Sequence, residues 1–177
     1  MSRKRKFIGF WIVLIMFGAV FPGAFYLMSF LLDAVLGLPR FVSQPAGVFL
    51  AAFCVATGLF WITWAYSYLH FVGRGSPIEA FGLALYPTQT LVTTGPYAYT
   101  RNPMLVGLIF LLLAIAFYRG SISGLALIPI IAVAAVLYIK AFEEPGLARR
   151  FGEEYVEYRR KVPMLIPSLR LRLTRPQ

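Results

Sequence analysis

The stretch that decides the fold runs from residue 104 to residue 142 and reads MLVGLIFLLLAIAFYRGSISGLALIPIIAVAAVLYIKAF. It contains two apolar runs, residues 104–118 and 122–142, which are separated by Arg119 and Gly120. Because glycine commonly ends helices, we expect two helices folded back on each other as a hairpin. About 20 apolar residues cross the hydrocarbon core of a bilayer, so the second run is long enough to span it and the first is short.

Two further apolar runs, residues 7–32 and 46–71, precede the hairpin and are long enough to span. The chain is 59% hydrophobic and only 14% charged, far from the average soluble domain. We therefore predict an all-α integral membrane protein with about four transmembrane helices in one domain, residues 1–177. The first run is too long for a signal peptide, so we expect a retained helix, kinked or interrupted near Pro22 and Gly23.

The basic residues are distributed unevenly along the chain. Fifteen of the 17 Lys and Arg lie before the first run, in residues 72–102, or from Lys140 onward, and only Arg40 and Arg119 fall in the other two loops. Since basic loops are retained in the cytoplasm, we expect both termini and both polar segments on the cytoplasmic side. The net charge of +10 then reflects topology and attraction to anionic lipid headgroups, and we expect no nucleic-acid partner.

Few residues offer metal-binding or acid–base chemistry. Cys54 is the single cysteine, which excludes an internal disulfide or a multi-cysteine metal site, and we expect no metal. Cys54 is expected to pack within a helix. His70 is the single histidine and lies at the end of a predicted helix, where we expect an interfacial structural role.

The first polar segment, residues 72–102, ends in a distinctive turn. Its Gly and Pro residues argue against a helix, and QTLVTTGPY, residues 89–97, is typical of an extended piece ending in a Gly-Pro turn. Pro103 is expected to be the first helical residue, with Asn102 as its N-cap. Taken alone, the sequence TRNP is explained as a helix start whose Arg101 reaches lipid phosphate.

The second polar segment begins with Glu143 and Glu144 at a predicted membrane exit. Two ionised carboxylates at that position cost free energy unless a cation pairs with them. The alternative explanation is a solvated helix end. Apolar residues then recur every three or four positions, which predicts an amphipathic tail helix on the cytoplasmic side. The residues of this stripe are Leu147, Phe151, Tyr155 and Tyr158. We expect the stripe to pack on the bundle or to lie on the bilayer.

Together, the two polar segments resemble the isoprenylcysteine carboxyl methyltransferase and phospholipid methyltransferase superfamily of small membrane enzymes. In that family a GPYxYxRHPxYxG turn precedes a helical hairpin, and EExxLxxxFGxxYxxYxxxVPxxxP follows it. The first motif is matched here by Gly95, Pro96, Tyr97, Tyr99, Arg101, Asn102, Pro103 and Gly107. The second is matched by Glu143, Glu144, Leu147, Phe151, Gly152, Tyr155, Tyr158, Val162, Pro163 and Pro167. The resemblance covers residues 73–167 and includes GRGSP, which is similar to a GxGTP loop of prokaryotic members.

The resemblance implies S-adenosylmethionine as cofactor, S-adenosylhomocysteine as product, and residues 72–167 as the cofactor-binding core, followed by a basic tail at 168–177. It places cofactor contacts on Gln89, Thr90, Leu91, Val92, Tyr97, Asn102, Pro103, Met104, Leu105 and Glu143. It places Arg101, Asn102 and Glu144 at the catalytic centre. Carboxylates suit the ammonium and ribose hydroxyls of this cofactor, and tyrosine faces suit its sulfonium.

Three positions depart from the family pattern. Asn102 stands where many members have His, Leu105 replaces a Tyr, and Ile139 stands where the eukaryotic prenylcysteine enzymes carry an Arg. These departures leave open whether the acceptor atom is oxygen, nitrogen or sulfur, and the oligomeric state is also open. We expect methyl transfer to an apolar, membrane-embedded acceptor that enters laterally from the bilayer: a prenylcysteine-like carboxylate, a phospholipid amine or a related lipid. The alternatives are a sterol-reductase-like enzyme that uses a nicotinamide cofactor, and a non-catalytic membrane protein on the same scaffold.

Overall fold

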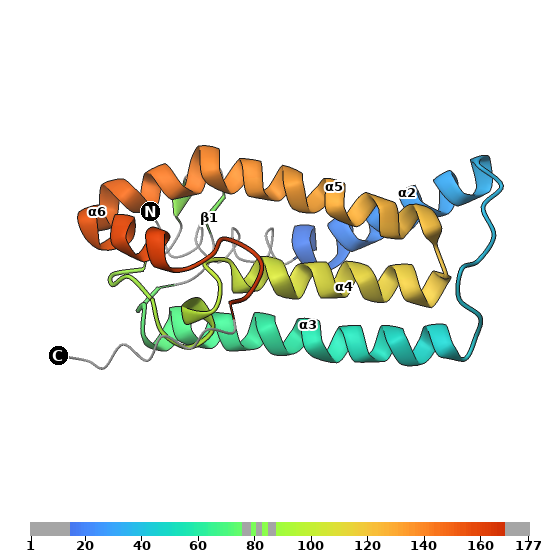
Figure 1. The fold of residues 1–177 in the computed structure, drawn as a ribbon, viewed down its shortest axis with the longest axis horizontal. Helices are drawn as coiled ribbons and strands as arrows, with labels where there is room; N and C mark the ends of the chain where they lie inside the picture. The colour runs from blue at the N-terminus through green and yellow to red at the C-terminus, as the bar shows by residue number, and fades with distance from the viewer. Residues whose placement is uncertain (1–14, 76–78, 81–82, 85–87, 169–177) are drawn as a thin grey trace.

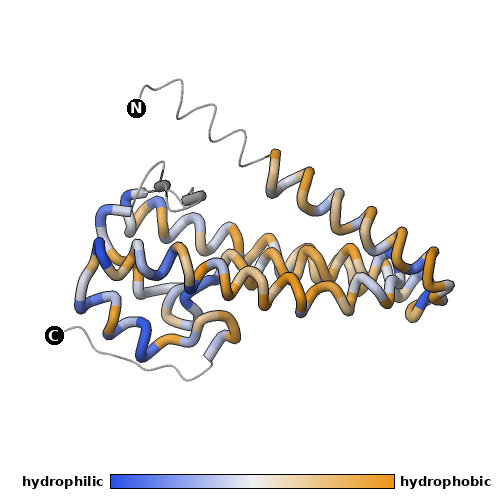
Figure 2. Tube along the Cα trace, turned by 90° about the horizontal axis from the view of Figure 1, so that it is seen from above, coloured by the Kyte–Doolittle hydropathy of each residue, from blue (hydrophilic) through white to orange (hydrophobic). Residues whose placement is uncertain are grey.

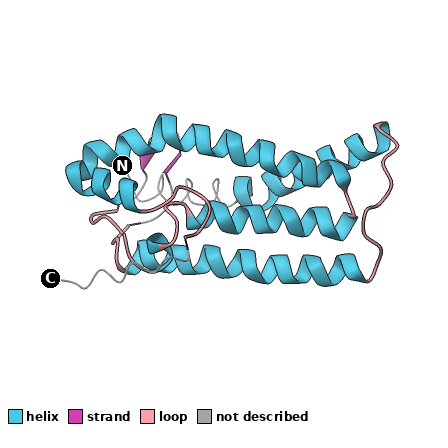
Figure 3. Ribbon diagram, viewed as in Figure 1, coloured by secondary structure: helices cyan, strands magenta, loops and turns pink. Residues whose placement is uncertain are grey.

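A computed structural model describes residues 15–75, 79–80, 83–84 and 88–168, and these residues are mainly helical (Figures 1 and 3). The helices are η1 (Met16–Val20), α2 (Phe21–Val35), α3 (Ala46–Phe71), η2 (Gly95–Ala98), α4 (Pro103–Arg119), α5 (Ile122–Tyr138), η3 (Ile139–Glu143) and α6 (Glu144–Lys161). Two strands of two residues each, β1 (Glu79–Ala80) and β2 (Leu83–Ala84), pair antiparallel between α3 and α4. The prediction of a helical membrane-type fold is confirmed, with this short hairpin as the only strand pair in the described residues.

Three helical segments are long and apolar enough to cross a membrane: Gly18–Val35, Ala46–Phe71 and Ile122–Lys161. Helix α4 is apolar but has only 17 residues. At about 1.5 Å per residue it rises about 26 Å, a little less than the roughly 30 Å of a typical hydrocarbon core. The four-span count therefore stays a prediction that depends on α4.

Helices α3, α4 and α5 lie side by side along the long axis, and α2 diverges from them (Figures 1 and 2). The closest packing joins α3 to α4. A Cβ atom on Gly58 would lie 2.8 Å from the Gly107 carbonyl oxygen, and one on Gly107 would lie 2.7 Å from the Gly58 carbonyl oxygen. Small residues let helix backbones approach in this way, which is the usual basis of helix association in lipid.

The hairpin predicted from residues 104–142 is present. Gly120 ends α4 in a left-handed conformation with φ of +64°, and the Ser121 hydroxyl caps α5 by accepting from the Gly124 backbone N–H. At this same end, α2 is attached to the hairpin through Asp33. The Asp33 carboxylate accepts from the Ser123 backbone N–H at 3.0 Å and lies 4.0 Å from the Arg119 guanidinium.

The predicted break near Pro22 takes a different form in the structure. The interruption near Pro22 is the π-helical turn η1, in which the Phe21 N–H donates to the Met16 carbonyl, and the helix continues through Pro22. A proline ring displaces the preceding turn, and a π-turn accommodates the displacement. The rest of the predicted first run, residues 7–14, lies outside the described residues.

The helix also continues past residue 142, where the last apolar run ends. The π-helical turn η3 joins α5 to α6 without interruption, and the chain then curves toward the loops at the ends of α3 and α4 (Figure 1). The predicted tail helix coincides with α6 but is divided at Gly152, which adopts φ of +57° and ψ of −135°. Hydrophilic residues are concentrated around α6, whereas the neighbouring helices are mainly hydrophobic (Figure 2).

Candidate functional site

Two predicted site residues from opposite sides of the hairpin form an ion pair. Arg101 lies in the turn before α4, and Glu144 is the first residue of α6. Helices α4 and α5 have 17 residues each, so the chain returns to the level it left and the two side chains meet. Arg101 Nη1 lies 2.9 Å from Glu144 Oε1, and the side chains are only 10% and 8% exposed. The carboxylate of Glu144, at the predicted membrane exit, is thus compensated by a cation from the first polar segment.

A second arginine and a tyrosine complete the surroundings of Glu144. Arg159 Nη1 lies 3.8 Å from Glu144 Oε2, and the Tyr155 hydroxyl is within hydrogen-bonding reach of the carboxylate. Arg101 Nε, Arg101 Nη1 and Glu144 Oε1 are buried yet make no aligned hydrogen bond with the described residues. The 2.9 Å contact is therefore an ion pair in which both groups retain hydrogen-bonding capacity. Buried polar atoms of this kind call for a functional or ligand-based explanation.

Tyrosines from both polar segments pack beside this ion pair. Tyr97, Tyr155 and Tyr158 form a buried cluster, and the Tyr158 hydroxyl donates to the Tyr97 carbonyl at 2.8 Å. Val92 and Ala65 are also buried in this cluster, and Leu91, Met104, Leu147 and Phe151 pack against it. Burial, together with the neighbouring Tyr158, raises the pKa of Tyr97 above the ordinary tyrosine value, so its ring stays neutral. The predicted stripe of α6 therefore packs on the turn before α4.

Residues 162–168, called the C-terminal strap below, cross over this turn. The Arg101 backbone N–H donates to the Pro163 carbonyl at 2.9 Å, and the Thr100 hydroxyl donates to the Met164 carbonyl at 3.0 Å. Further along, the Ser168 N–H donates to the Tyr99 carbonyl at 2.9 Å. Arg101 is thus held on its backbone side by the strap while its side chain reaches Glu144.

Asn102 corrects one prediction from the sequence. It occupies the N-cap position of α4, but its side chain makes no capping hydrogen bond. Instead, its Nδ2 donates to the Met164 carbonyl at 3.0 Å. The carbonyl groups of the strap need donors, and the amide of asparagine supplies one. Pro103 is the first residue of α4, as predicted, and is fully buried.

The remaining predicted cofactor residues occupy different surroundings. Leu91, Val92, Tyr97 and Met104 belong to the tyrosine cluster or pack against it, and Leu105 is buried on α4. Gln89 and Thr90 are exposed and attached to the end of α3: the Gln89 N–H donates to the Gly73 carbonyl and the Thr90 hydroxyl to the Val72 carbonyl. Glu143 is half-buried at the end of η3. Their roles as cofactor contacts stay predictions.

The sequence analysis missed Arg159, Thr100 and the Met164 carbonyl. Arg159 follows Tyr155 by four residues on α6, so helical periodicity could have placed both on the Glu144 side. Thr100 is fully buried beside Arg101. A backbone carbonyl such as that of Met164 leaves no signal in the residue types. Within the described part of the chain, no three His, Cys, Asp or Glu residues are grouped as metal ligands.

Apolar helices of membrane-spanning length that carry a buried, ion-paired polar site at one end define an integral membrane protein with a candidate active site. The profile of the family described as "Phospholipid methyltransferase" matches residues 46–154, and the chain belongs to this family. The match runs from the start of α3 into α6, so it contains both Arg101 and Glu144. The resemblance noted in the sequence is thereby confirmed, and the family is one of methyltransferases.

Several curated proteins are similar to the chain. Methanethiol S-methyltransferase 2 of Bradyrhizobium diazoefficiens is 30% identical over 140 residues, which cover 75% of this chain and 52% of that protein. Protein-S-isoprenylcysteine O-methyltransferase of Homo sapiens is 35% identical over 92 residues, or 47% of this chain and 29% of that protein. The chain thus spans about half or less of the length of these relatives. No solved structure matches it significantly.

Proposed function

We propose that this protein transfers a methyl group from S-adenosylmethionine to an apolar acceptor in the membrane. The observation that carries the proposal is the buried Arg101–Glu144 pair with unused hydrogen-bonding capacity, located inside the family match. The names of the relatives support methyl transfer as the reaction class.

The residues at this end suit the polar groups of such a cofactor. Glu144 Oε1 and Arg101 Nε are buried polar atoms available to a ligand, and Glu143 lies next to them in the chain. The two carboxylates would receive an ammonium or ribose hydroxyls, and the tyrosine rings would face a sulfonium. When bound, S-adenosylmethionine supplies a methyl group activated by its positively charged sulfur.

The chain's own residues contribute mainly orientation and exclusion of water. Arg101 is fixed at its backbone by the C-terminal strap and at its guanidinium by Glu144. The buried tyrosine cluster keeps water from one side of the pair. An acceptor that is already an anion or a free amine needs little proton transfer, so alignment of the reacting atoms dominates. Asn102 cannot act as a base near neutral pH, which is consistent with this limited role for proton chemistry.

The acceptor is proposed to be a lipid or a lipid-like small molecule. The printed names of the relatives differ in the atom that is methylated, sulfur in one and oxygen in the other. Burial of a tail contributes about 0.8 kcal/mol per methylene, so a long-chain acceptor gains affinity that a small polar head lacks. We place the site and both termini on the cytoplasmic side because of the excess of Lys and Arg there.

Ligand-dependent thermal stability tests the proposal. The purified protein would be melted in detergent with S-adenosylhomocysteine and, separately, with NADPH. A ligand that binds only the folded state stabilises it by mass action, and we expect a rise in Tm of about 5 °C or more at a hundredfold excess over Kd. A rise with NADPH and none with S-adenosylhomocysteine would support the reductase alternative instead. No rise with either would indicate a non-catalytic scaffold.

A further inference from the structure

A basic depression lies beside the C-terminal strap, and Arg101 of the Arg101–Glu144 pair is one of its lining residues. It is open, with a volume of about 590 Å3. Its lining consists of Arg101, Arg159, Arg160, Lys161, Val162, Pro163, Ile166, Pro167 and Ser168. Arg160 and Lys161 belong to this lining and take no part in the Arg101–Glu144 pair or in the strap.

The charge of this depression is strongly one-sided. Four of its lining residues are cations and none is a carboxylate. Glu144, which is not part of the lining, pairs with both Arg101 and Arg159, and Glu157 pairs with Lys161. Arg160 also interacts electrostatically with Glu157, although the two form no ion pair within the described part of the chain. Two carboxylates therefore face four cations, and the depression has an excess of positive charge that fits an anion.

Apolar residues lie next to these cations. Val162, Pro163, Ile166 and Pro167 belong to the same lining, and Ile166 is 80% exposed. An exposed branched aliphatic side chain beside cationic groups suits an amphiphile better than a free inorganic anion. A lipid has both parts, a charged headgroup and acyl chains.

The aromatic residues of α3 indicate the level of the depression relative to a bilayer. Trp61, Trp64 and Tyr68 follow one another near the C-terminal end of this apolar helix, and Trp64 is in contact with Tyr99 at 6.0 Å between ring centroids. Trp and Tyr concentrate at the level of lipid headgroups. The Tyr99 carbonyl accepts from the Ser168 N–H, and Ser168 lines the depression. The depression is therefore at the height where lipid phosphates are found.

We propose that this depression binds the phosphate of an anionic membrane lipid, such as phosphatidylglycerol, as a bound lipid and not as the methyl acceptor. Phosphatidylglycerol has no amine to methylate. The inference is independent of the proposed methyl transfer, because it rests on the charge, the apolar rim and the level of the depression.

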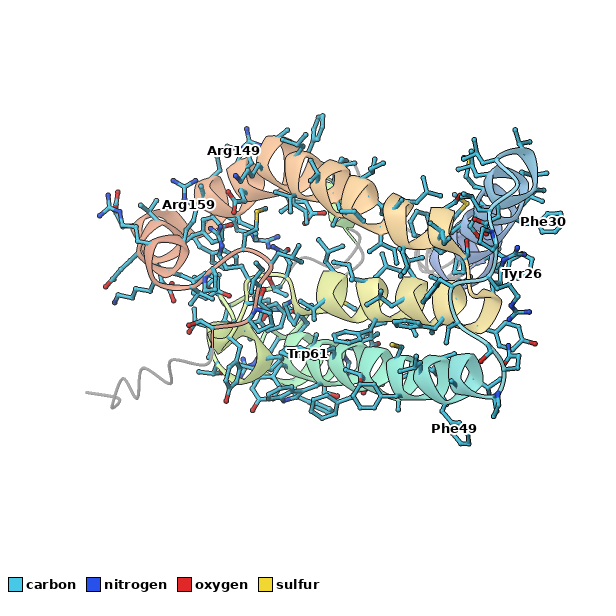
Figure 4. The ribbon with its side chains drawn as sticks, turned by 45° about the vertical axis from the view of Figure 1, so that its right-hand side comes forward. Tyr26, Phe30, Phe49, Trp61, Arg149 and Arg159 are labelled. Carbon is cyan, nitrogen blue, oxygen red and sulfur yellow. The ribbon has the colours of Figure 1, made fainter. Side chains whose placement is uncertain are left out.

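Native mass spectrometry of the full chain in detergent tests the proposal. Phosphatidylglycerol and phosphatidylcholine with the same acyl chains would be titrated onto the protein and onto the double variant Arg160→Gln/Lys161→Gln. The matched control is Lys140→Gln/Arg149→Gln, which removes two exposed cations outside the lining. Figure 4 shows Arg149 and Arg159 on different parts of α6. The single variant Arg160→Gln is included because it breaks no ion pair of the described residues.

We expect tighter binding of phosphatidylglycerol than of phosphatidylcholine, and about a tenfold or greater loss of this binding in the double variant. The affinity for phosphatidylglycerol should fall several-fold in Arg160→Gln and less than about twofold in the control variant. Equal losses in the control and the double variant would overturn the proposal in favour of diffuse attraction. Competition by glycerol phosphate as strong as that by the lipid would overturn the lipid assignment in favour of a free anion.

Discussion

The side chain of Asn102 links the turn before α4 to the C-terminal strap. Its amide Nδ2 donates to the Met164 carbonyl, so it fastens the strap to the turn before α4. Arg101, the next residue toward the N-terminus, donates through its backbone to Pro163. Asn102 therefore positions Arg101 through the strap.

Replacement of Asn102 by Asp tests this role. The carboxylate of Asn102→Asp has no donor and repels the Met164 carbonyl, so we expect a loss of about 1–3 kcal/mol in stability. The melting temperature in detergent measures the loss, and S-adenosylhomocysteine affinity reports the displacement of Arg101. Asn102→His retains a hydrogen-bond donor, so it should recover part of the melting temperature and part of the S-adenosylhomocysteine affinity. Equal behaviour of the Asp and His variants would show that the strap contact is unimportant.

Glu144 is the carboxylate that two arginines share. In Glu144→Gln, the guanidinium of Arg101 stays buried without its counter-ion, and removing one member of a buried pair costs about 3–5 kcal/mol. The exposed pair of Glu157 and Lys161 provides the comparison, because water screens exposed ion pairs and they contribute little to stability. Urea unfolding of Glu144→Gln and Glu157→Gln measures the free energy of unfolding that each variant loses. Similar losses would indicate that the buried pair contributes no more than a surface contact.

Helices α3 and α4 form the best-packed pair of elements, and two glycines permit it. Their backbones approach at Gly58 and Gly107, where a Cβ atom would lie within 2.8 Å of a carbonyl oxygen of the facing helix. This packing fixes the start of α4 against α3, and the turn with Arg101 lies directly before that start. The contact between α3 and α4 at these two glycines therefore helps to set the position of Arg101 in the site.

Gly107→Ala tests the contact. The added methyl group forces the two backbones apart, and we expect a destabilisation of about 1–3 kcal/mol. Gly23→Ala on α2 is the control, because a Cβ atom there would meet no atom within 4 Å. The change in melting temperature of the two variants gives the comparison. A Gly107→Ala protein as stable as the control would mean that α4 shifts freely along α3.

The whole molecule has two polar ends separated by an apolar middle. One end carries the candidate site. At the other, Arg119 lies near Asp33 and over the rings of Tyr26 and Phe30, at 4.7 and 4.9 Å. Figure 4 labels these two aromatic residues at the end of the molecule opposite α6. Phe49 on α3 points away from the bundle and is 72% exposed (Figure 4), which suits contact with lipid chains. The two ends are thus expected on opposite sides of a membrane.

Cysteine labelling tests this arrangement. The native Cys54 is 4% exposed and gives little background. Two variants each introduce one exposed cysteine: Ser43→Cys in the loop between α2 and α3, and Glu153→Cys on α6. In intact cells, a maleimide that cannot cross membranes should label Ser43→Cys only, and both after lysis. Labelling of both positions before lysis would contradict the proposed cytoplasmic location of α6.

The sequence by itself determined the class of fold and the ends of most helices. Three features are local properties of the chain and can be predicted without knowledge of tertiary contacts. They are the apolar runs of bilayer length, the break at Arg119 and Gly120, and the start of α4 at Pro103. The motif residues were found in the same way, because residue types and spacing are visible in one dimension.

Only the tertiary structure decided which partners these residues take. The Glu143–Glu144 pair is compatible with a solvated helix end in one dimension, and it is the return of the hairpin that brings Arg101 to Glu144. The use of the Asn102 amide on the strap, in place of a helix cap, depends on a carbonyl 62 residues away. The contact of Tyr158 with Tyr97 likewise joins residues that are 61 positions apart in the chain. Contacts between distant segments follow from the packed arrangement of the helices, and residue types alone do not record that arrangement.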